Sequence, residues 1–329
     1  MSATSPAESG APAAPSRLAR AVKLAGIGVA VLAVALCVVT LVRAWGDISH
    51  SVAHANLGWL LVGLICAAGS MTGLGVLWWR CLGLFGHPVR LGSAVSWYFG
   101  GELGKYVPGG VWPVLGRGEL ASRAGIPRTT GYVTTLISYA AMCIGSALVC
   151  GVLAPIVAAD GQGLSYGWLM LLLIPIGLAA LHPAVLGRLL VLGGKLTKGR
   201  VTIQPQPWSK MVGLTLTSCA TWVLVGATSV AVTQSLGYSQ PPARVAFAAV
   251  AAWIIGFLAI PVPAGAGLRE LVFLAVSGLD HGPALAVAAI ARVLFIVVDG
   301  LGGAIGLAAV RRSRPRPAAT PPTGITTGS

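Results

Sequence analysis

The chain has 329 residues, of which 56% are hydrophobic and 9% are charged, and its mean hydropathy is +0.84. Soluble domains carry about 25% charged residues, so this composition excludes a soluble protein and predicts an all-α, polytopic helical membrane protein. The formal net charge of +14 does not predict a nucleic-acid partner, because the basic residues flank apolar runs, as Lys and Arg do in cytoplasmic loops.

Six apolar runs are candidates to cross the hydrocarbon core, ~30 Å thick, as helices. In chain order they are 24–42, 57–79, 130–157, the shorter 168–181, 211–234 and 284–310. Basic residues precede the first run and follow the last, which predicts that both termini are cytoplasmic in a cell (inner or plasma) membrane. Residues 1–16 and 313–329 are rich in Pro, Ala, Ser and Thr. We predict disordered tails there and a membrane domain at 17–312.

Two apolar segments are short and run into breaks rich in proline and glycine. Residues 91–104 would extend only about 21 Å as a helix, and 245–260 is followed by a Pro-Gly stretch and the short run 271–279. If each segment enters the membrane and returns on the same side, every basic loop stays cytoplasmic. We therefore predict about six crossings and two oppositely oriented re-entrant hairpins, whose irregular backbone must be buried in protein or line a wet cavity.

The two breaks resemble each other in sequence. The predicted break residues are Pro108, Gly109, Gly110, Pro261, Pro263, Gly265 and Gly267. Beside them, Gly116, Glu119 and Leu120 align with Gly267, Glu270 and Leu271. Together with the opposite orientations, the match predicts an inverted repeat with units at about 57–157 and 211–310, as in many secondary transporters. Chance, or ordinary Gly/Pro kinks, is the alternative explanation of so short a match.

Ionisable residues cluster near both breaks. An ionisable side chain in the membrane costs about 2.5–3.5 kcal/mol on insertion scales, so it usually faces a cavity or a partner. The candidate substrate-pathway residues are Glu102, Lys105, Arg117, Glu119, Arg123, Arg269, Glu270, Arg292 and Asp299. We expect four neighbouring pairs: Glu102 with Lys105, Arg117 with Glu119, Arg269 with Glu270, and Arg292 with Asp299.

Arg269 and Glu270 are the strongest of these candidates because they adjoin a Pro-Gly break. A guanidinium suits a bidentate grip on a lipid phosphate; a structural ion pair that holds the hairpin is the alternative. For Arg292 and Asp299, which share a helical face, intramembrane pairing and pathway lining are both open. For Arg123, anchoring at the membrane interface competes with headgroup contact.

Catalytic signatures are absent from the sequence. There is no Gly-x-Ser-x-Gly, HExxH or Walker pattern, so hydrolysis, zinc chemistry and ATP-driven pumping lack support. His50 and His54 have i,i+4 spacing but no third ligand. We expect neither an enzyme nor a cofactor nor a metal site.

Around the breaks, the chain resembles the flippase-like transmembrane domain family of lysylphosphatidylglycerol synthases. The resemblance covers about residues 20–310 and rests on Pro108-Gly-Gly110 with Gly118-Glu-Leu-Ala-Ser-Arg123, and on Pro261-Val-Pro-Ala-Gly-Ala-Gly-Leu-Arg-Glu270. Ala264 stands where a glycine is usual in this family. The resemblance implies translocation of lipids, such as aminoacylated phosphatidylglycerol, between leaflets. It does not imply synthase activity, which belongs to a separate soluble domain in the bifunctional members.

Three functions remain open at this point. The first is a translocase for a membrane phospholipid, anionic or aminoacylated, or for a polyprenyl-linked lipid; a cavity open sideways to lipid would favour it. The second is a small-solute secondary transporter, which a sealed cavity would favour. The third is a non-transporting membrane partner of an envelope enzyme that transfers lipid or glycosyl groups, which tight packing without a polar cavity would favour.

Overall fold

The computed structural model describes residues 55–106, 111–159, 207–259 and 267–312, together with Gly265 and a few positions within 171–179. These residues form eight α-helices and one short 3-10 helix, with no strand among them, which confirms the predicted all-α class. The predicted run at 24–42, most of the run at 168–181, both tails and five of the break residues lie outside the described residues. Those five are Pro108, Gly109, Gly110, Pro261 and Pro263.

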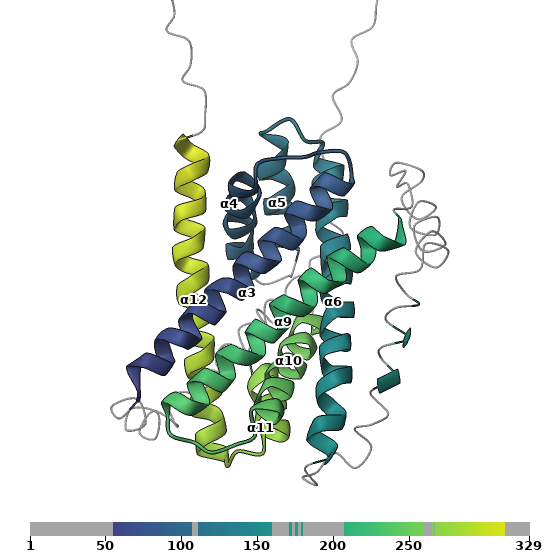
Figure 1. Ribbon diagram of the computed structural model, residues 1–329. Helices are drawn as coiled ribbons and strands as arrows, with labels where there is room; N and C mark the ends of the chain where they lie inside the picture. Colours follow the sequence, from purple (N-terminus) through teal and green to yellow (C-terminus); the bar gives the residue numbers. More distant parts are fainter. Residues whose placement is uncertain are drawn as a thin grey trace, which may run out of the picture.

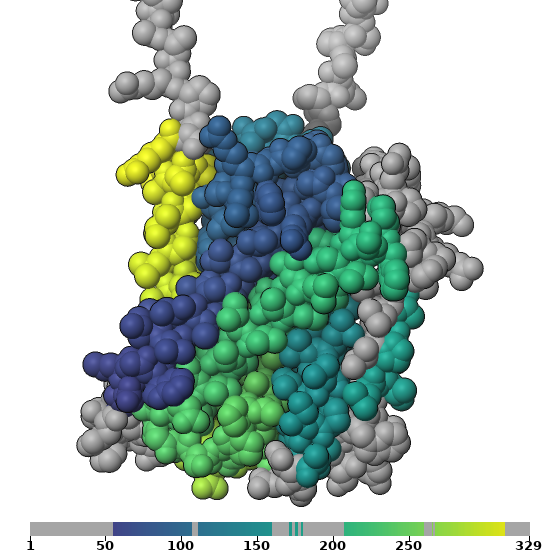
Figure 2. Space-filling view, viewed as in Figure 1, coloured from purple at the N-terminus to yellow at the C-terminus, as the bar shows by residue number. Residues whose placement is uncertain are grey.

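Four of the described helices are long and apolar enough to cross a membrane: α3 (Leu57–Leu84), α6 (Arg128–Ala159), α9 (Trp208–Ser235) and α12 (His281–Arg312). Each contains one of the predicted runs and extends past it at one or both ends. At ~1.5 Å per residue they are about 42–48 Å long, so they can cross the hydrocarbon core while tilted. In Figure 1, α3 and α9 run diagonally beside each other between α12 and α6. Figure 2 shows the two diagonal helices, in blue and green, covering the face towards the viewer.

Two pairs of shorter helices occupy opposite ends of the bundle. The first pair is α4 (Leu91–Glu102), continued by the 3-10 helix η1 (Leu103–Tyr106), and α5 (Trp112–Ser122); the second is α10 (Pro242–Leu258) and α11 (Leu268–Ser277). Each pair comes between two long helices in the chain. The first lies at the upper end in Figure 1 and the second at the lower end, the placement that the predicted pair of opposed hairpins requires.

The two halves of the chain follow the same plan, because the order α3–α4–α5–α6 recurs as α9–α10–α11–α12. The opening helices α3 and α9 pack against each other. The short helix α4 packs against α12 of the other half, and α10 packs against α6. This exchange of contacts is what two inverted copies produce when they associate about a two-fold axis.

Helices α5 and α6 approach closely because glycines face each other at their crossing. A Cβ atom at Gly131 would lie 2.7 Å from the Cα atom of Gly118, so the two backbones meet through small residues, as membrane helices often do. We expect Gly131→Ala to cost about 1–3 kcal/mol of stability through overpacking and to lower the melting temperature in detergent. The matched control is Gly213→Ala in α9, where a Cβ meets nothing within 4 Å and helix propensity favours alanine. Equal melting temperatures in the two variants would contradict this expectation.

Candidate functional site

Seven ionisable side chains gather inside the bundle, and we call them the central cluster. They are Glu102, Lys105, Arg117, Arg269, Glu270, Arg292 and Asp299. The elements that carry them are the two short helix pairs and the closing helix α12. Both halves of the repeat therefore contribute charge to one region of the protein interior.

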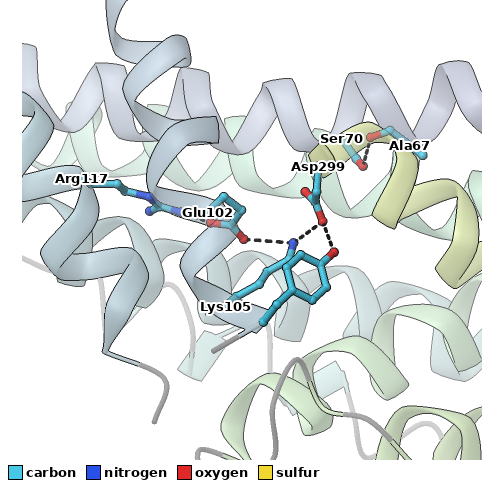
Figure 3. Close-up of polar contacts among 7 residues, drawn as sticks. Ala67, Ser70, Glu102, Lys105, Arg117 and Asp299 are labelled. Atoms are coloured by element: carbon cyan, nitrogen blue, oxygen red, sulfur yellow. Dashed lines mark hydrogen bonds and ion pairs between the residues drawn. The ribbon is translucent and has the colours of Figure 1, made fainter. Parts of the chain in front are cut away.

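Lys105 on η1 links the first half to α12. Its Nζ atom lies 3.2 Å from Oε1 of Glu102 and 2.7 Å from Oδ2 of Asp299. The hydroxyl of Tyr106 donates to the same Asp299 oxygen at 2.7 Å. Figure 3 shows Lys105 between the two carboxylates, with Arg117 on the far side of Glu102. The Asp299 side chain has no exposed surface, so these contacts to one of its oxygens offset part of the cost of burying the carboxylate.

Arg117 on α5 pairs with the other oxygen, Oε2, of Glu102. Its guanidinium lies 4.1 Å from the ring centre of Tyr98. The side chain passes over Gly101, where a Cβ atom would lie 2.7 Å from Cγ of Arg117. Glycine at this position therefore makes room for the arginine. We call Tyr98, Gly101 and Arg117 the first arginine stack.

The second half builds the same arrangement from Trp253, Gly256 and Arg269, the second arginine stack. The guanidinium of Arg269 lies 3.9 Å from the ring centre of Trp253, and a Cβ atom at Gly256 would lie 2.9 Å from its Nε. In both stacks the aromatic residue stands three positions before the glycine. Gly265 also adjoins Arg269 Nε; like Gly267 it has a positive φ, 66° and 83° respectively, a conformation that favours glycine.

The two stacks differ in the charge that faces the arginine. Arg117 is paired with Glu102, whereas no ion pair forms at Arg269 within the described part of the chain. The buried Nε atoms of both arginines have no hydrogen-bond partner there, so the two arginines differ only in the ion pair. The adjacent Glu270 is engaged elsewhere: Oε1 accepts from Arg292, and Oε2 accepts from the Gly267 N–H at 2.7 Å. The central cluster holds four cations and three carboxylates, so its single positive excess falls at Arg269.

Two cavities flank this arginine. The larger, of about 310 Å³, is lined by Tyr98 and Arg117 of the first arginine stack, by Glu102 and by mostly apolar residues. The smaller, of about 70 Å³, is lined by Glu270, Arg292 and Asp299 with apolar neighbours. Three residues belong to both linings and form what we call the common wall: Lys105, Trp253 and Arg269.

The larger cavity also has an apolar edge. Val111, Leu136 and Leu258 are part of its lining, and they are 53%, 57% and 61% exposed. They stand immediately before α5, on α6 and at the end of α10. A polar interior with an apolar, exposed edge can receive a charged group while the hydrocarbon attached to that group stays outside.

Seven of the nine candidate residues meet in the central cluster, and Glu119 and Arg123 do not. The side chains of Glu119 and Arg123 are 43% and 49% exposed on α5, and Glu119 accepts from Arg128 at 2.8 Å. Neither lines the two cavities. The physical reason is helical geometry, because residues two apart, such as Arg117 and Glu119, do not share a helix face.

Of the other three expected ion pairs, one forms and two are replaced by contacts with other residues. Glu102 and Lys105 pair as expected, but Arg269 and Glu270, adjacent in a helix, diverge. Arg292 and Asp299 share a face and line the smaller cavity, yet seven residues separate them by about 10.5 Å along the axis, too far for direct pairing. Each of the two instead pairs across to another helix.

Sequence reasoning missed the aromatic and glycine members of the two arginine stacks. Their one signal is the shared spacing, Tyr98-x-x-Gly101 and Trp253-x-x-Gly256. The described residues contain no group of three or more His, Cys, Asp or Glu that could hold a metal ion. What the arrangement offers chemically is a cationic, partly enclosed site for an anion.

Comparison with known families gives one match. The family described as Lysylphosphatidylglycerol synthase TM region matches residues 24–303. The match includes both short helix pairs and every member of the central cluster. No curated protein matches the chain.

Proposed function

The chain belongs to the lysylphosphatidylglycerol synthase TM-region family, and we propose that it moves a phospholipid or a lipid-linked headgroup between the two leaflets of the membrane. It is a membrane protein of a family related to lipid handling. Our proposal goes beyond family membership in assigning lipid translocation, and this assignment is based on the geometry of the central cluster.

The observation that carries the proposal is Arg269 on the common wall, which has no ion-pair partner among the described residues. A guanidinium binds a phosphate through two parallel hydrogen bonds, and a phosphodiester brings the one negative charge that the cluster lacks. The larger cavity is lined by both short helix pairs together with α3 and α6, and the smaller one mainly by the second pair and α12. A phosphate held at Arg269 can thus be reached from both halves of the protein.

The charge distribution supports an orientation for this passage. Arg80 near the end of α3, Arg128 at the start of α6, and Arg311 and Arg312 at the end of α12 share the end of the bundle that carries α4 and α5. The retention of basic residues on the cytoplasmic side supports a cytoplasmic position for this end. The first helix pair, which forms part of the lining of the larger cavity, then lies in the cytoplasmic half.

The cavities bear on the two competing functions. A non-transporting scaffold has no need of a polar cavity inside its bundle. A carrier of small solutes needs a cavity closed to lipid, whereas the larger cavity has an exposed apolar edge at Val111, Leu136 and Leu258. Both features favour a lipid substrate.

The test is reconstitution of the full-length protein into vesicles that contain fluorescent phosphatidylglycerol. Dithionite added outside bleaches only the outer leaflet, so empty vesicles should keep about half of their fluorescence. We expect vesicles with the protein, with or without a pH gradient, to lose the remainder as labelled lipid reaches the outer leaflet. A parallel arm with trapped glycerol phosphate reports a solute carrier. Vesicles that move neither lipid nor solute would contradict the proposal and favour the partner role.

A further inference from the structure

The first arginine stack shows what a buried arginine in this setting binds. Glu102 directly follows Gly101 in α4 and neutralises Arg117. At the equivalent point of α10, Phe257 directly follows Gly256. The phenylalanine ring packs edge-on against Tyr139, with 5.1 Å between ring centres, and lines the larger cavity together with Arg269. The chain therefore has an apolar ring in the second stack where the first has a carboxylate.

A second donor stands beside Arg269. The indole Nε1 of Trp253 is buried and has no hydrogen-bond partner among the described residues, although buried indole N–H groups usually find one. The neighbouring Trp222 packs edge-on against Trp253. Its indole N–H has a partner, because it donates to the carbonyl oxygen of Met142 at 2.8 Å. The common wall therefore carries two donor groups, on Arg269 and Trp253, that have no partner within the described part of the chain, and both suit a phosphate oxygen.

A positively charged part of a headgroup finds no exposed, unpaired carboxylate among the described residues that line these cavities. Both oxygens of Glu102 and both oxygens of Glu270 already accept hydrogen bonds or ion pairs. Asp299 has one oxygen with no partner among the described residues, but its side chain has no exposed surface. The aromatic faces of Tyr98 and Trp253, which could hold an ammonium group, are both occupied by arginine.

We infer that the second arginine stack binds the phosphate of a headgroup whose net charge is negative, and that it rejects headgroups whose ammonium groups offset that charge. This inference rests on the proposed lipid translocation and narrows its substrate class. The phosphodiester of an anionic glycerophospholipid and that of a polyprenyl-phosphate sugar share the required chemistry. An aminoacylated headgroup, with a net positive charge, does not meet it.

The sharpest test supplies the missing carboxylate from the protein itself. In Phe257→Glu, the new carboxylate should pair with Arg269 as Glu102 pairs with Arg117 and should exclude the lipid phosphate. Phe257→Gln is the matched control, because it has nearly the same shape without the charge. Charged hydrogen bonds contribute about 1.5–3 kcal/mol, so we expect Phe257→Glu to exchange phosphatidylglycerol at least about tenfold more slowly than Phe257→Gln. Melting temperatures in detergent show whether both variants are folded, and equal exchange by two folded variants would overturn the inference.

A panel of lipids tests the selectivity directly in the wild-type protein. The probes are fluorescent phosphatidylglycerol, a polyprenyl-phosphate sugar, phosphatidylcholine and the lysyl ester of phosphatidylglycerol. We expect exchange of at least one of the two anionic lipids to be about tenfold faster than that of phosphatidylcholine or the lysyl ester, from the same range of binding energy. Equal rates for all four would overturn the charge selectivity and leave translocation standing. Failure to move any of the four would overturn translocation itself.

Discussion

Glu102→Gln is expected to destabilise the protein by about 3–5 kcal/mol, the range for breaking a buried ion pair from one side. Glu102 is 6% exposed and accepts from two cations through separate oxygens. Lys105 keeps Asp299 after the change, but Arg117 loses its carboxylate while its side chain stays 2% exposed. A glutamine can accept a hydrogen bond and cannot balance that charge. The measurement is the free energy of unfolding in mixed micelles titrated with a denaturing detergent.

Glu119→Gln is the control for this prediction. It is the same substitution on the neighbouring helix, at a side chain that is 43% exposed and paired with surface arginines. Exposed ion pairs are screened by solvent and contribute little to stability, so this variant should unfold close to the wild type. Similar losses in both variants would show that Glu102 does not hold the first helix pair together.

Hydropathy and charge were sufficient to predict the part of the fold that depends on the bilayer. Apolar runs near 57–79, 130–157, 211–234 and 284–310 became α3, α6, α9 and α12 because a lipid-exposed backbone must satisfy its hydrogen bonds internally. The short runs near 91–104 and 245–260 became α4 and α10, each followed by a second short helix. These outcomes follow from length and composition, which are properties of the sequence alone.

The partners within the site could not be predicted in the same way. Sequence proximity suggested Arg117 with Glu119 and Arg269 with Glu270, yet neighbours in a helix point in different directions. Glu102 and Arg292 approach their partners only after helices pack, so their contacts depend on the tertiary structure. The alignment of Gly116 with Gly267 also failed to predict the contacts, because it placed Arg117 opposite Leu268. The packing instead makes Arg117 the counterpart of Arg269. The number of residues between the stack glycine and its arginine differs in the two halves, so a sequence alignment without gaps does not pair the two arginines.

Arg269→Ala is expected to abolish lipid exchange while leaving the protein folded. The change removes the one cation of the central cluster that lacks a carboxylate, so no ion pair within the described residues is broken. Loss of its charged hydrogen bonds to a phosphate, at about 1.5–3 kcal/mol, corresponds to a rate at least about tenfold lower. The exchange rate of Arg269→Lys should lie between those of the wild type and Arg269→Ala. Lysine keeps the charge but lacks the planar guanidinium that stacks on Trp253 and binds two phosphate oxygens.

The most direct test is the initial rate of phosphatidylglycerol exchange by Arg269→Ala, measured beside Arg123→Ala in vesicles with equal amounts of folded protein. Arg123 lies at the surface, and Glu119 retains Arg128 when Arg123 is lost, so the control should exchange lipid at the wild-type rate. We expect Arg269→Ala to fall to the rate of empty vesicles. Wild-type exchange by folded Arg269→Ala would contradict the assignment of the lipid phosphate to this arginine.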